Sequence, residues 1–256
     1  MKILQGCVRY PPAPGGAETV VKAYSEGLRD LGHDVEVVTT DLYTETPFVK
    51  KKMPSVVNGI NVTRHKAYTV SGEAHYVLAP GMVQSFLSKN ADIIHTHSYG
   101  YFQNHAGWIR ERFQSTPWVI TPHFHPSWSM WGGSKRKTLR EFYDTVIGKG
   151  TLEAADLITC VSKHERDMLV SEIGLKEDNI KIIYNGINWA DWSSVPNKEV
   201  FRKQYPTVSE KFVLFAGRLA TNKGLSDLIS AMQLIDKKSV DLVITGADMG
   251  LGKQLE

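Results

Sequence analysis

Short runs of β-branched and other apolar residues alternate along the chain with segments of helical periodicity. Residues 2–8 (KILQGCV) predict a strand, and a loop rich in proline and glycine follows it. Apolar residues then recur every three or four positions up to Leu31, and Gly32 ends the predicted helix before a second strand at 34–40 (DVEVVTT). The chain therefore opens with a strand–loop–helix–strand unit.

The same alternation continues to residue 187. Further strands are predicted at 91–97, 117–123, 156–162 and 180–186. Helical patterns separate them near 74–89, 104–114, 135–154 and 163–173. Because strands that alternate with helices form parallel sheets covered on both faces, residues 1–187 predict an α/β, Rossmann-like domain.

The pattern changes after residue 187. Residues 188–210 contain tryptophans, serines and prolines with little strand signal, which predicts an interdomain linker with one short helix. A second strand–loop–helix–strand unit then runs from KFVLFAG (211–217) to VDLVITG (240–246). Two strands and one helix are too few to bury both faces of a sheet. Residues 211–256 therefore predict the beginning of a second Rossmann-like domain, either cut short or completed by another chain.

Composition and charge narrow the class of protein. With 42% hydrophobic and 22% charged residues the chain is typical of globular proteins, and a net charge of +3 is too small to indicate nucleic-acid binding. Basic residues gather within 46–72 and 134–140, which indicates either solvated surface or contact with a phosphate-rich ligand or an anionic membrane. Two cysteines and the absence of a long apolar run favour a cytoplasmic protein, with peripheral contact at the inner face of the membrane left open.

The loop after the first strand is a candidate binding element. Ligands of doubly wound sheets bind at the carboxyl ends of the strands, where helix N-termini attract phosphate. Gly15 and Gly16 lie at this position, although their spacing does not fit a dinucleotide fingerprint, and a turn that simply requires glycine is the alternative. Glu18 is the acidic residue clearly placed at this edge, so a glycosidase with two facing carboxylates is disfavoured.

Two His-x-His pairs end predicted strands. They are His95 with His97 and His123 with His125. Alternate residues of a strand share a face, so each pair should lie together at the same edge of the sheet. A metal site is one interpretation, but no cysteine or Asp-x-Asp pair accompanies the histidines. The other two interpretations are that at least one of these histidines lies in an active cleft, or that all of them have structural roles.

The loop of the second unit carries two cations. Arg218 follows its first strand directly, and Lys223 with Gly224 opens the next helix. A guanidinium and an ammonium beside a helix N-terminus can bind a diphosphate, although the spacing is not that of a P-loop. Two solvated cations are the alternative.

The ordered set of segments resembles a known family. The segments are PPAPGGAETVV, DIIHTHSY, VITPHFH, ADLITCVSKHERD, IYNGIN and FAGRLATNKGLSDLISAM. In this order they resemble the retaining glycosyltransferases of family 4, which have the GT-B fold of two facing Rossmann-like domains. The family also carries two glutamates eight positions apart, a motif that would follow the last residue here.

The resemblance implies roles for individual residues. His123 would be catalytic, beside the transferred sugar. Gly16, Arg218 and Lys223 would bind the donor diphosphate. Gly15 would lie near the acceptor, and Glu18, His97 and Asn185 are further candidates for the acceptor side or the cleft from the sequence itself.

The resemblance also implies substrates. The donor would be a UDP- or GDP-linked sugar and the acceptor a glycan or a lipid-linked molecule, with no cofactor and no metal. The alternatives are a non-catalytic fragment that binds acceptor, a nucleotide-sugar epimerase of the GT-B fold and a histidine-rich metal hydrolase.

Overall fold

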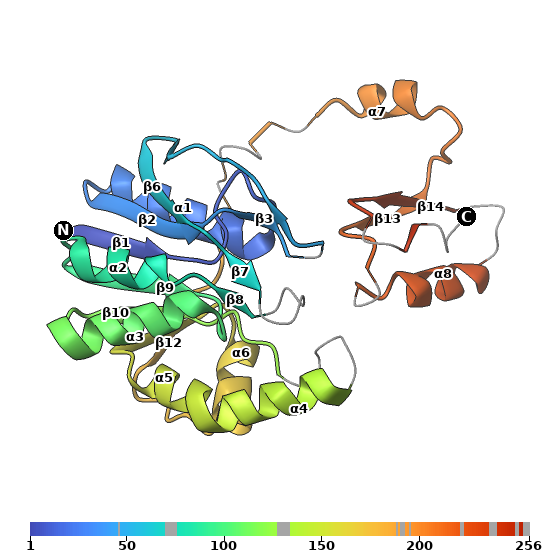
Figure 1. Ribbon diagram of the computed structural model, residues 1–256. Coiled ribbons are helices and arrows are strands. Elements are labelled where there is room, and N and C mark those ends of the chain that lie inside the picture. Colours follow the sequence, from blue (N-terminus) through green and yellow to red (C-terminus); the bar gives the residue numbers. More distant parts are fainter. Residues whose placement is uncertain are drawn as a thin grey trace. The chain divides into compact units, whose positions relative to one another are not determined.

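The computed structural model divides the chain into two compact units, Met1–Gly186 and Ile187–Glu256 (Figure 1). The structure describes residues 1–45, 47–69, 76–126, 134–187, 189, 193–194, 196–220, 223–235, 240–248 and 251–252, with the backbone alone at 134–136. Each unit has its own sheet, and each is described by itself.

The first unit is built on an eight-stranded sheet in the order β12-β11-β10-β9-β1-β2-β6-β5 (Figure 1). Its strands are β1 (Lys2–Gly6), β2 (Asp34–Thr40), β5 (Val56–Val57), β6 (Ile60–His65), β9 (Ile93–His97), β10 (Trp118–Thr121), β11 (Leu157–Cys160) and β12 (Ile180–Ile182). Neighbouring strands are parallel except β5 and β6, which are antiparallel. Two short antiparallel pairs lie outside this sheet: β3 (Leu42–Thr44) with β4 (Val49–Lys50), and β7 (Tyr68–Thr69) with β8 (Val77–Leu78).

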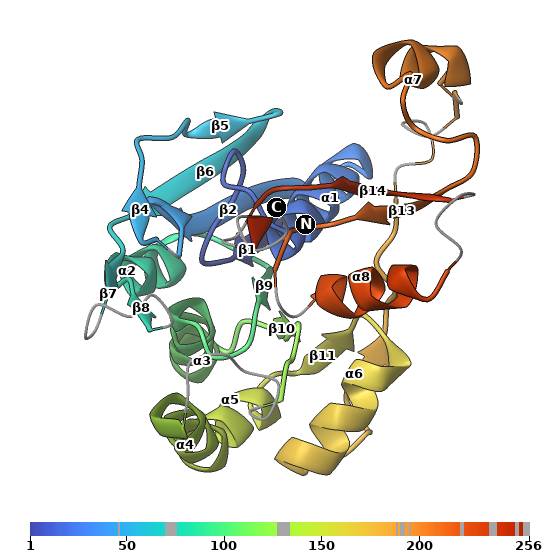
Figure 2. The same cartoon turned by 90° about the vertical axis from the view of Figure 1, so that its right-hand side faces the viewer.

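Helices cover both faces of the sheet because successive strand residues point to opposite sides. The α-helices in the described part of this unit are α1 (Gly16–Asp30), α2 (Gly81–Ser88), α3 (Phe102–Gln114), α4 (Ser134–Tyr143), α5 (Lys149–Glu153) and α6 (Lys163–Met168), and π-helical segments follow α4 (Asp144–Gly148) and α6 (Leu169–Ile173). Ile3 packs with Val21 of α1, whereas its neighbour Leu4 packs with Phe86 of α2. Figure 2 shows α1 on one side of the strands and α2 with α3 on the other. The predicted α/β class with a large parallel sheet is confirmed.

The second unit contains a two-stranded parallel sheet and two helices among its described residues. They are β13 (Phe212–Ala216), β14 (Asp241–Thr245), α7 (Lys198–Gln204) and α8 (Leu225–Gln233). An apolar hollow between α8 and β14 is lined by residues that include Ile229, Met232 and Leu242. Within the described ranges of the whole chain, no helix combines the length and the hydropathy needed to cross a bilayer.

Three sequence-based expectations differ from the structure. No strand was predicted within the basic segment 46–72, which was interpreted as solvated surface or as a contact for a phosphate-rich ligand or an anionic membrane, but Ile60–His65 forms β6 of the main sheet. The helix expected over 135–154 is three consecutive pieces, since Asp144–Gly148 adopts π-helical geometry. The helix expected near 74–89 begins at Gly81 within the described residues.

Candidate functional site

The carboxyl ends of β1 and β9 mark the point where the chain changes direction across the sheet. From β1 the chain passes through α1 to β2 on one side, whereas β9 pairs with β1 on the other. Loops diverge at such a switch point, and ligands of open parallel sheets bind there. Gly15, Gly16, the histidines of β9 and His123, which follows β10, all lie toward this edge of the first unit.

The two glycines after β1 differ in their surroundings. Gly16 is the first residue of α1, and an added Cβ there would meet nothing within 4 Å. An added Cβ at Gly15 would instead overlap the carboxylate of Glu18. The backbone at Gly16 is therefore open to a ligand, whereas Gly15 is required by the packing of Glu18.

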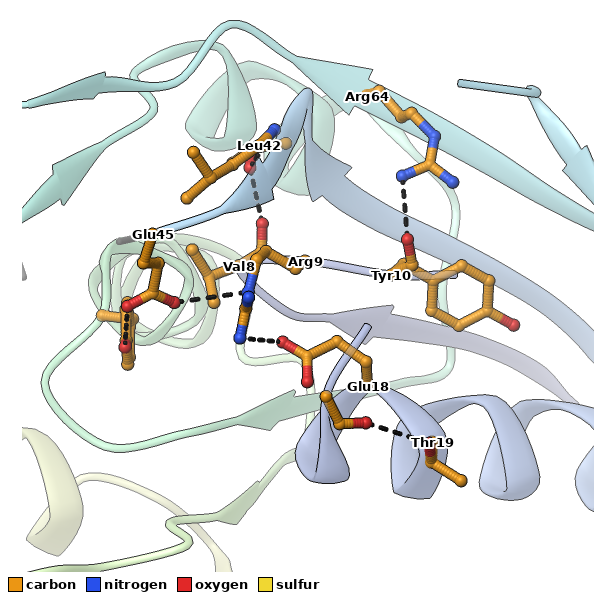
Figure 3. A network of polar contacts seen from close by, with 11 residues as sticks. Val8, Arg9, Tyr10, Glu18, Thr19, Leu42, Glu45 and Arg64 are labelled. Carbon is orange, nitrogen blue, oxygen red and sulfur yellow. Dashed lines mark hydrogen bonds and ion pairs between the residues drawn. The ribbon is translucent and has the colours of Figure 1, made fainter. Parts of the chain in front are cut away.

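Glu18 is not a free carboxylate but part of a polar network, shown in Figure 3. It is 4% exposed, and its Oε1 lies 2.7 Å from Nη2 of Arg9. Arg9 also pairs with Glu45 at 3.3 Å, and the hydroxyl of Tyr101 donates to Glu45 at 2.8 Å. Burial raises the pKa of Glu18, and the Arg9 guanidinium partly offsets that rise. The network ties together the loops that follow β1 and β9, and sequence patterns gave no signal for Arg9 or Glu45.

Backbone contacts hold the loop after β1 in place. Thr40 Oγ1 donates to the carbonyl of Val8 at 2.5 Å. The Arg64 guanidinium donates to the carbonyl of Tyr10 at 3.3 Å (Figure 3) and to the carbonyl of Pro11 at 2.6 Å. Burial lowers the pKa of Arg64. This member of the basic segment is therefore a structural residue rather than solvated surface.

The structure brings three of the four histidines together. The ring centroids of His95 and His97 are 4.1 Å apart, and those of His97 and His123 are 6.0 Å apart. His97 Nε2 lies 2.8 Å from Oε1 of Gln5, and His95 Nε2 lies 2.7 Å from Oγ1 of Thr121. Gln5 and Thr121 are partners that spacing alone did not predict.

Burial keeps these imidazoles neutral. It lowers the pKa of His95 to about 3 and that of His123 to about 4, and it lowers the pKa of His97 well below its usual value. Neighbouring histidines add a smaller effect in the same direction. The cluster can therefore exchange hydrogen bonds with a ligand but offers no fixed positive charge near neutral pH. In the described part of the chain, no three His, Cys, Asp or Glu side chains are grouped as metal ligands.

In the second unit, two exposed cations flank the carboxyl end of β13. Arg218 follows this strand, and Lys223 precedes Gly224, the N-cap of α8. The backbone on either side of Arg218 is held against the end of β14, because Gly217 N–H donates to the carbonyl of Thr245 at 2.9 Å and Leu219 N–H donates to the carbonyl of Ala247 at 2.9 Å. Among the described residues, neither cation has an ion pair. A helix N-terminus and two available cations together favour anions at this strand end.

The remaining predicted positions lie apart from these contacts. Asn185 is exposed in the loop that follows β12. Trp128 and Trp131, which follow the candidate residue His123 in the sequence, lie outside the described residues.

The fold of the chain is that of the GT-B glycosyltransferases. Its structure is similar to that of Anabaena HepE in complex with UDP and glucose, with a TM-score of 0.66, 21% sequence identity and coverage of 99% of this chain and 63% of that one. The chain belongs to glycosyltransferase family 4, whose family model matches residues 14–190.

Two relatives bear this out. The chain is 28% identical over 265 residues to an uncharacterised glycosyltransferase of Methanocaldococcus jannaschii, covering 96% of this chain and 63% of the relative. It is 23% identical over 259 residues to GDP-mannose:cellobiosyl-diphosphopolyprenol alpha-mannosyltransferase of Xanthomonas oryzae pv. oryzae, covering 99% of this chain and 62% of the relative. The chain thus spans less than two thirds of the length of these relatives.

Proposed function

We propose that the protein transfers a sugar from a UDP- or GDP-linked donor to a glycan or lipid-linked acceptor, with retention at C1 and without a metal. Membership of glycosyltransferase family 4 supports the reaction class. The observation that carries the donor assignment is the pair Arg218 and Lys223, both exposed at one strand end beside the first turn of α8. Two cations at a helix N-terminus complement the charge of a diphosphate.

In the proposed reaction, the bond between sugar C1 and the diphosphate oxygen breaks, and its electron pair stays on that oxygen. Arg218 and Lys223 stabilise the growing negative charge, and loss of one such contact typically costs on the order of 10²–10³ in rate. The acceptor hydroxyl attacks C1 from the face that the leaving group vacates, and its proton passes to an oxygen of the leaving diphosphate.

His123 would orient the transferred sugar in this reaction. Burial lowers the pKa of His123 to about 4, so the ring is neutral near pH 7. A neutral imidazole can donate one hydrogen bond and accept another, which suits a sugar hydroxyl. It is a poor proton donor at that pH, and this agrees with a mechanism in which the acceptor proton goes to the leaving group.

A lipid-linked acceptor at an anionic membrane surface on the cytoplasmic side is part of the proposal. One relative is named as a mannosyltransferase that acts on cellobiosyl-diphosphopolyprenol. A second, 25% identical over 250 residues that cover 94% of this chain and 51% of the relative, is the GPI3 subunit of a phosphatidylinositol N-acetylglucosaminyltransferase of Saccharomyces cerevisiae. On α4 and the turn after it, exposed Leu139, Phe142 and Val146 accompany exposed Lys137. Sedimentation with vesicles that contain or lack anionic lipid tests this contact, and equal recovery without vesicles would contradict it.

Calorimetric titration with UDP, GDP and ADP tests the donor site. We expect one of these nucleotides to bind, and Arg218→Ala or Lys223→Ala to weaken it about 10- to 100-fold, the usual effect of losing a charged hydrogen bond. Lys211→Ala is the matched control, because Lys211 is also exposed but lies at the opposite end of β13. The proposal fails if no nucleotide binds or if the control loses as much affinity.

Transfer assays with a sugar donor that carries the nucleotide found to bind test the acceptor, the retention of configuration and the metal independence. We expect transfer to a polyprenyl diphosphate-linked sugar or to a soluble glycan in the presence of EDTA, with the donor's anomeric configuration kept in the product. Product inversion would contradict retention, and loss of activity in EDTA that Mg²⁺ restores would contradict metal independence. Conversion of the donor sugar without any acceptor would indicate an epimerase instead.

A further inference from the structure

The carboxylate of Glu165 joins the two loops that follow β10 and β11. Glu165 lies in the first turn of α6 and is 3% exposed. Its Oε1 accepts a hydrogen bond from the N–H of Phe124 at 2.7 Å, and its Oε2 accepts one from the N–H of Val161 at 2.6 Å. Each carboxylate oxygen therefore holds the backbone of a different loop.

The contact with Phe124 acts directly on the backbone of His123. The N–H of Phe124 belongs to the peptide plane that begins at the carbonyl of His123, so its direction is set by the ψ angle of His123. His123 has a φ of 46°, in the left-handed region that residues other than glycine rarely occupy. Such a conformation persists only where the surrounding structure holds it. The Glu165 oxygen is placed to do so.

Two other hydrogen bonds of the described part of this loop lie farther from the His123–Phe124 peptide. The carbonyl of Pro122 accepts from the N–H of Tyr99 at 2.6 Å, and the carbonyl of His125 accepts from Arg140 at 3.2 Å. The Arg140 guanidinium also lies 5.6 Å from the centre of the Phe124 ring. These contacts fix the path of the loop, whereas Glu165 fixes the orientation of the peptide next to the histidine ring.

A carboxylate is suited to this task because both of its oxygens accept hydrogen bonds. Burial raises the pKa of Glu165, and the hydrogen bonds from Phe124 and Val161 oppose that rise. A glutamine of the same shape would present one oxygen and one NH₂ group, so that the backbone N–H of either Phe124 or Val161 would face another donor. Glu165→Gln therefore disturbs the contact without removing volume.

We propose that Glu165 is a positioning residue for His123, acting through the Phe124 amide to hold the imidazole at the carboxyl end of β10. Its expected effect on turnover rests on the proposed function, whereas its effect on the geometry of the loop does not.

The experiment compares Glu165→Gln with Ser162→Ala. Ser162 is the N-cap of α6, and its Oγ accepts from the N–H of Glu165 at 3.0 Å. The Ser162→Ala variant weakens the same helix turn but leaves the link to Phe124 in place. Amide hydrogen exchange of Phe124 and the ring ¹⁵N resonances of His123 are measured in both variants, together with the unfolding midpoint and transfer kinetics.

We expect Glu165→Gln to speed exchange of the Phe124 amide about tenfold or more and to shift the His123 ring resonances, whereas Ser162→Ala leaves both unchanged. In the transfer reaction, kcat of Glu165→Gln falls by up to about 10²-fold because the sugar is misplaced, while KM for the donor stays as in the wild type. The proposal is overturned if Glu165→Gln leaves exchange and resonances unchanged, or if Ser162→Ala changes them equally. A wild-type protein without transfer activity would overturn the proposed function alone, since the exchange measurement still decides the role of Glu165.

Discussion

The carboxylate of Glu18 packs against the α-carbon of Gly15, the residue that precedes helix α1. A Cβ at Gly15 would overlap this carboxylate, whereas a Cβ at Gly16 would meet nothing within 4 Å. Glu18 cannot simply swing away, because it is 4% exposed and pairs with Arg9 at 2.7 Å. The packing of Glu18 therefore requires glycine at position 15, whereas no neighbouring atom requires glycine at position 16.

Gly15→Ala should therefore destabilise the first unit, whereas Gly16→Ala should not. We expect Gly15→Ala to lower the free energy of unfolding by about 1–3 kcal/mol, the usual cost of forcing atoms into a packed site. Gly16→Ala should be neutral or stabilising by up to about 1 kcal/mol, since alanine is the better helix former. Urea denaturation measures both changes, and equal losses would show that the Glu18 contact is not the cause.

Arg9→Met tests the network around Glu18. The substitution keeps most of the side-chain length but leaves a nearly buried carboxylate without its cation, so we expect a loss of about 1–3 kcal/mol, below the value for a fully buried pair. Lys22→Met is the matched control, because the Lys22–Glu26 pair is 3.8 Å long and lies on the surface. A similarly small loss of unfolding free energy in both variants would show that the network around Glu18 does not contribute to stability.

The neutral histidines predict a dependence of stability on pH. Burial lowers the pKa of His95 to about 3, below the value of 6.5 for the unfolded chain. The unfolded state then binds more protons between these values, so stability is present above pH 6.5 and is lost as pH falls towards 3. The loss of unfolding free energy that comes from His95 between pH 7 and pH 5 should be about 2 kcal/mol.

His95→Gln isolates this effect, since glutamine can still donate to Thr121 but does not titrate. We expect the loss of unfolding free energy between pH 7 and pH 5 to be about 2 kcal/mol smaller in this variant than in the wild type. Titrations of Glu18 and Glu165, whose pKa values are raised by burial, occur in both proteins and cancel in the difference. Parallel pH profiles would contradict a buried, neutral His95.

His123→Ala and Arg218→Ala should separate catalysis from donor binding. We expect His123→Ala to lose most turnover, on the order of 10²-fold, while its affinity for the nucleoside diphosphate stays unchanged. Arg218→Ala should lose nucleotide affinity. Turnover kinetics and calorimetry together distinguish the two, and unchanged turnover in His123→Ala would remove this residue from the mechanism.

The strands that carry the candidate site could be predicted from sequence because their signal is local. Apolar runs bounded by polar or proline breaks located β1, β9, β10 and β11 to within a few residues. The period of two along β9 also predicted that His95 and His97 share a face, and their rings are 4.1 Å apart. What periodicity could not give is the partner across the sheet, such as Gln5 for His97, which lies 92 positions away.

Strand β6 was missed for a physical reason. Its sequence, INVTRH, has two apolar residues among polar and basic ones, and the segment around it reads as charged surface. Tertiary contacts decide its structure instead, because Ile60 and Val62 are buried in the core beneath α1 and the strand pairs with β2. The break of the 135–154 helix was missed because it also coincides with a tertiary contact. The π-helical segment ends at Gly148, where an added Cβ would overlap the hydroxyl of Tyr99 in the loop after β9.

Arg64 reaches from β6 to the loop after β1, where its guanidinium donates to the main-chain carbonyls of Tyr10 and Pro11. Such contacts do not depend on which side chains the loop carries. Side chains along this loop can therefore be substituted, and its surface chemistry changed, while the path of its backbone stays the same. If Arg64 itself were replaced, the path of the loop would depend on the side chains that the loop carries.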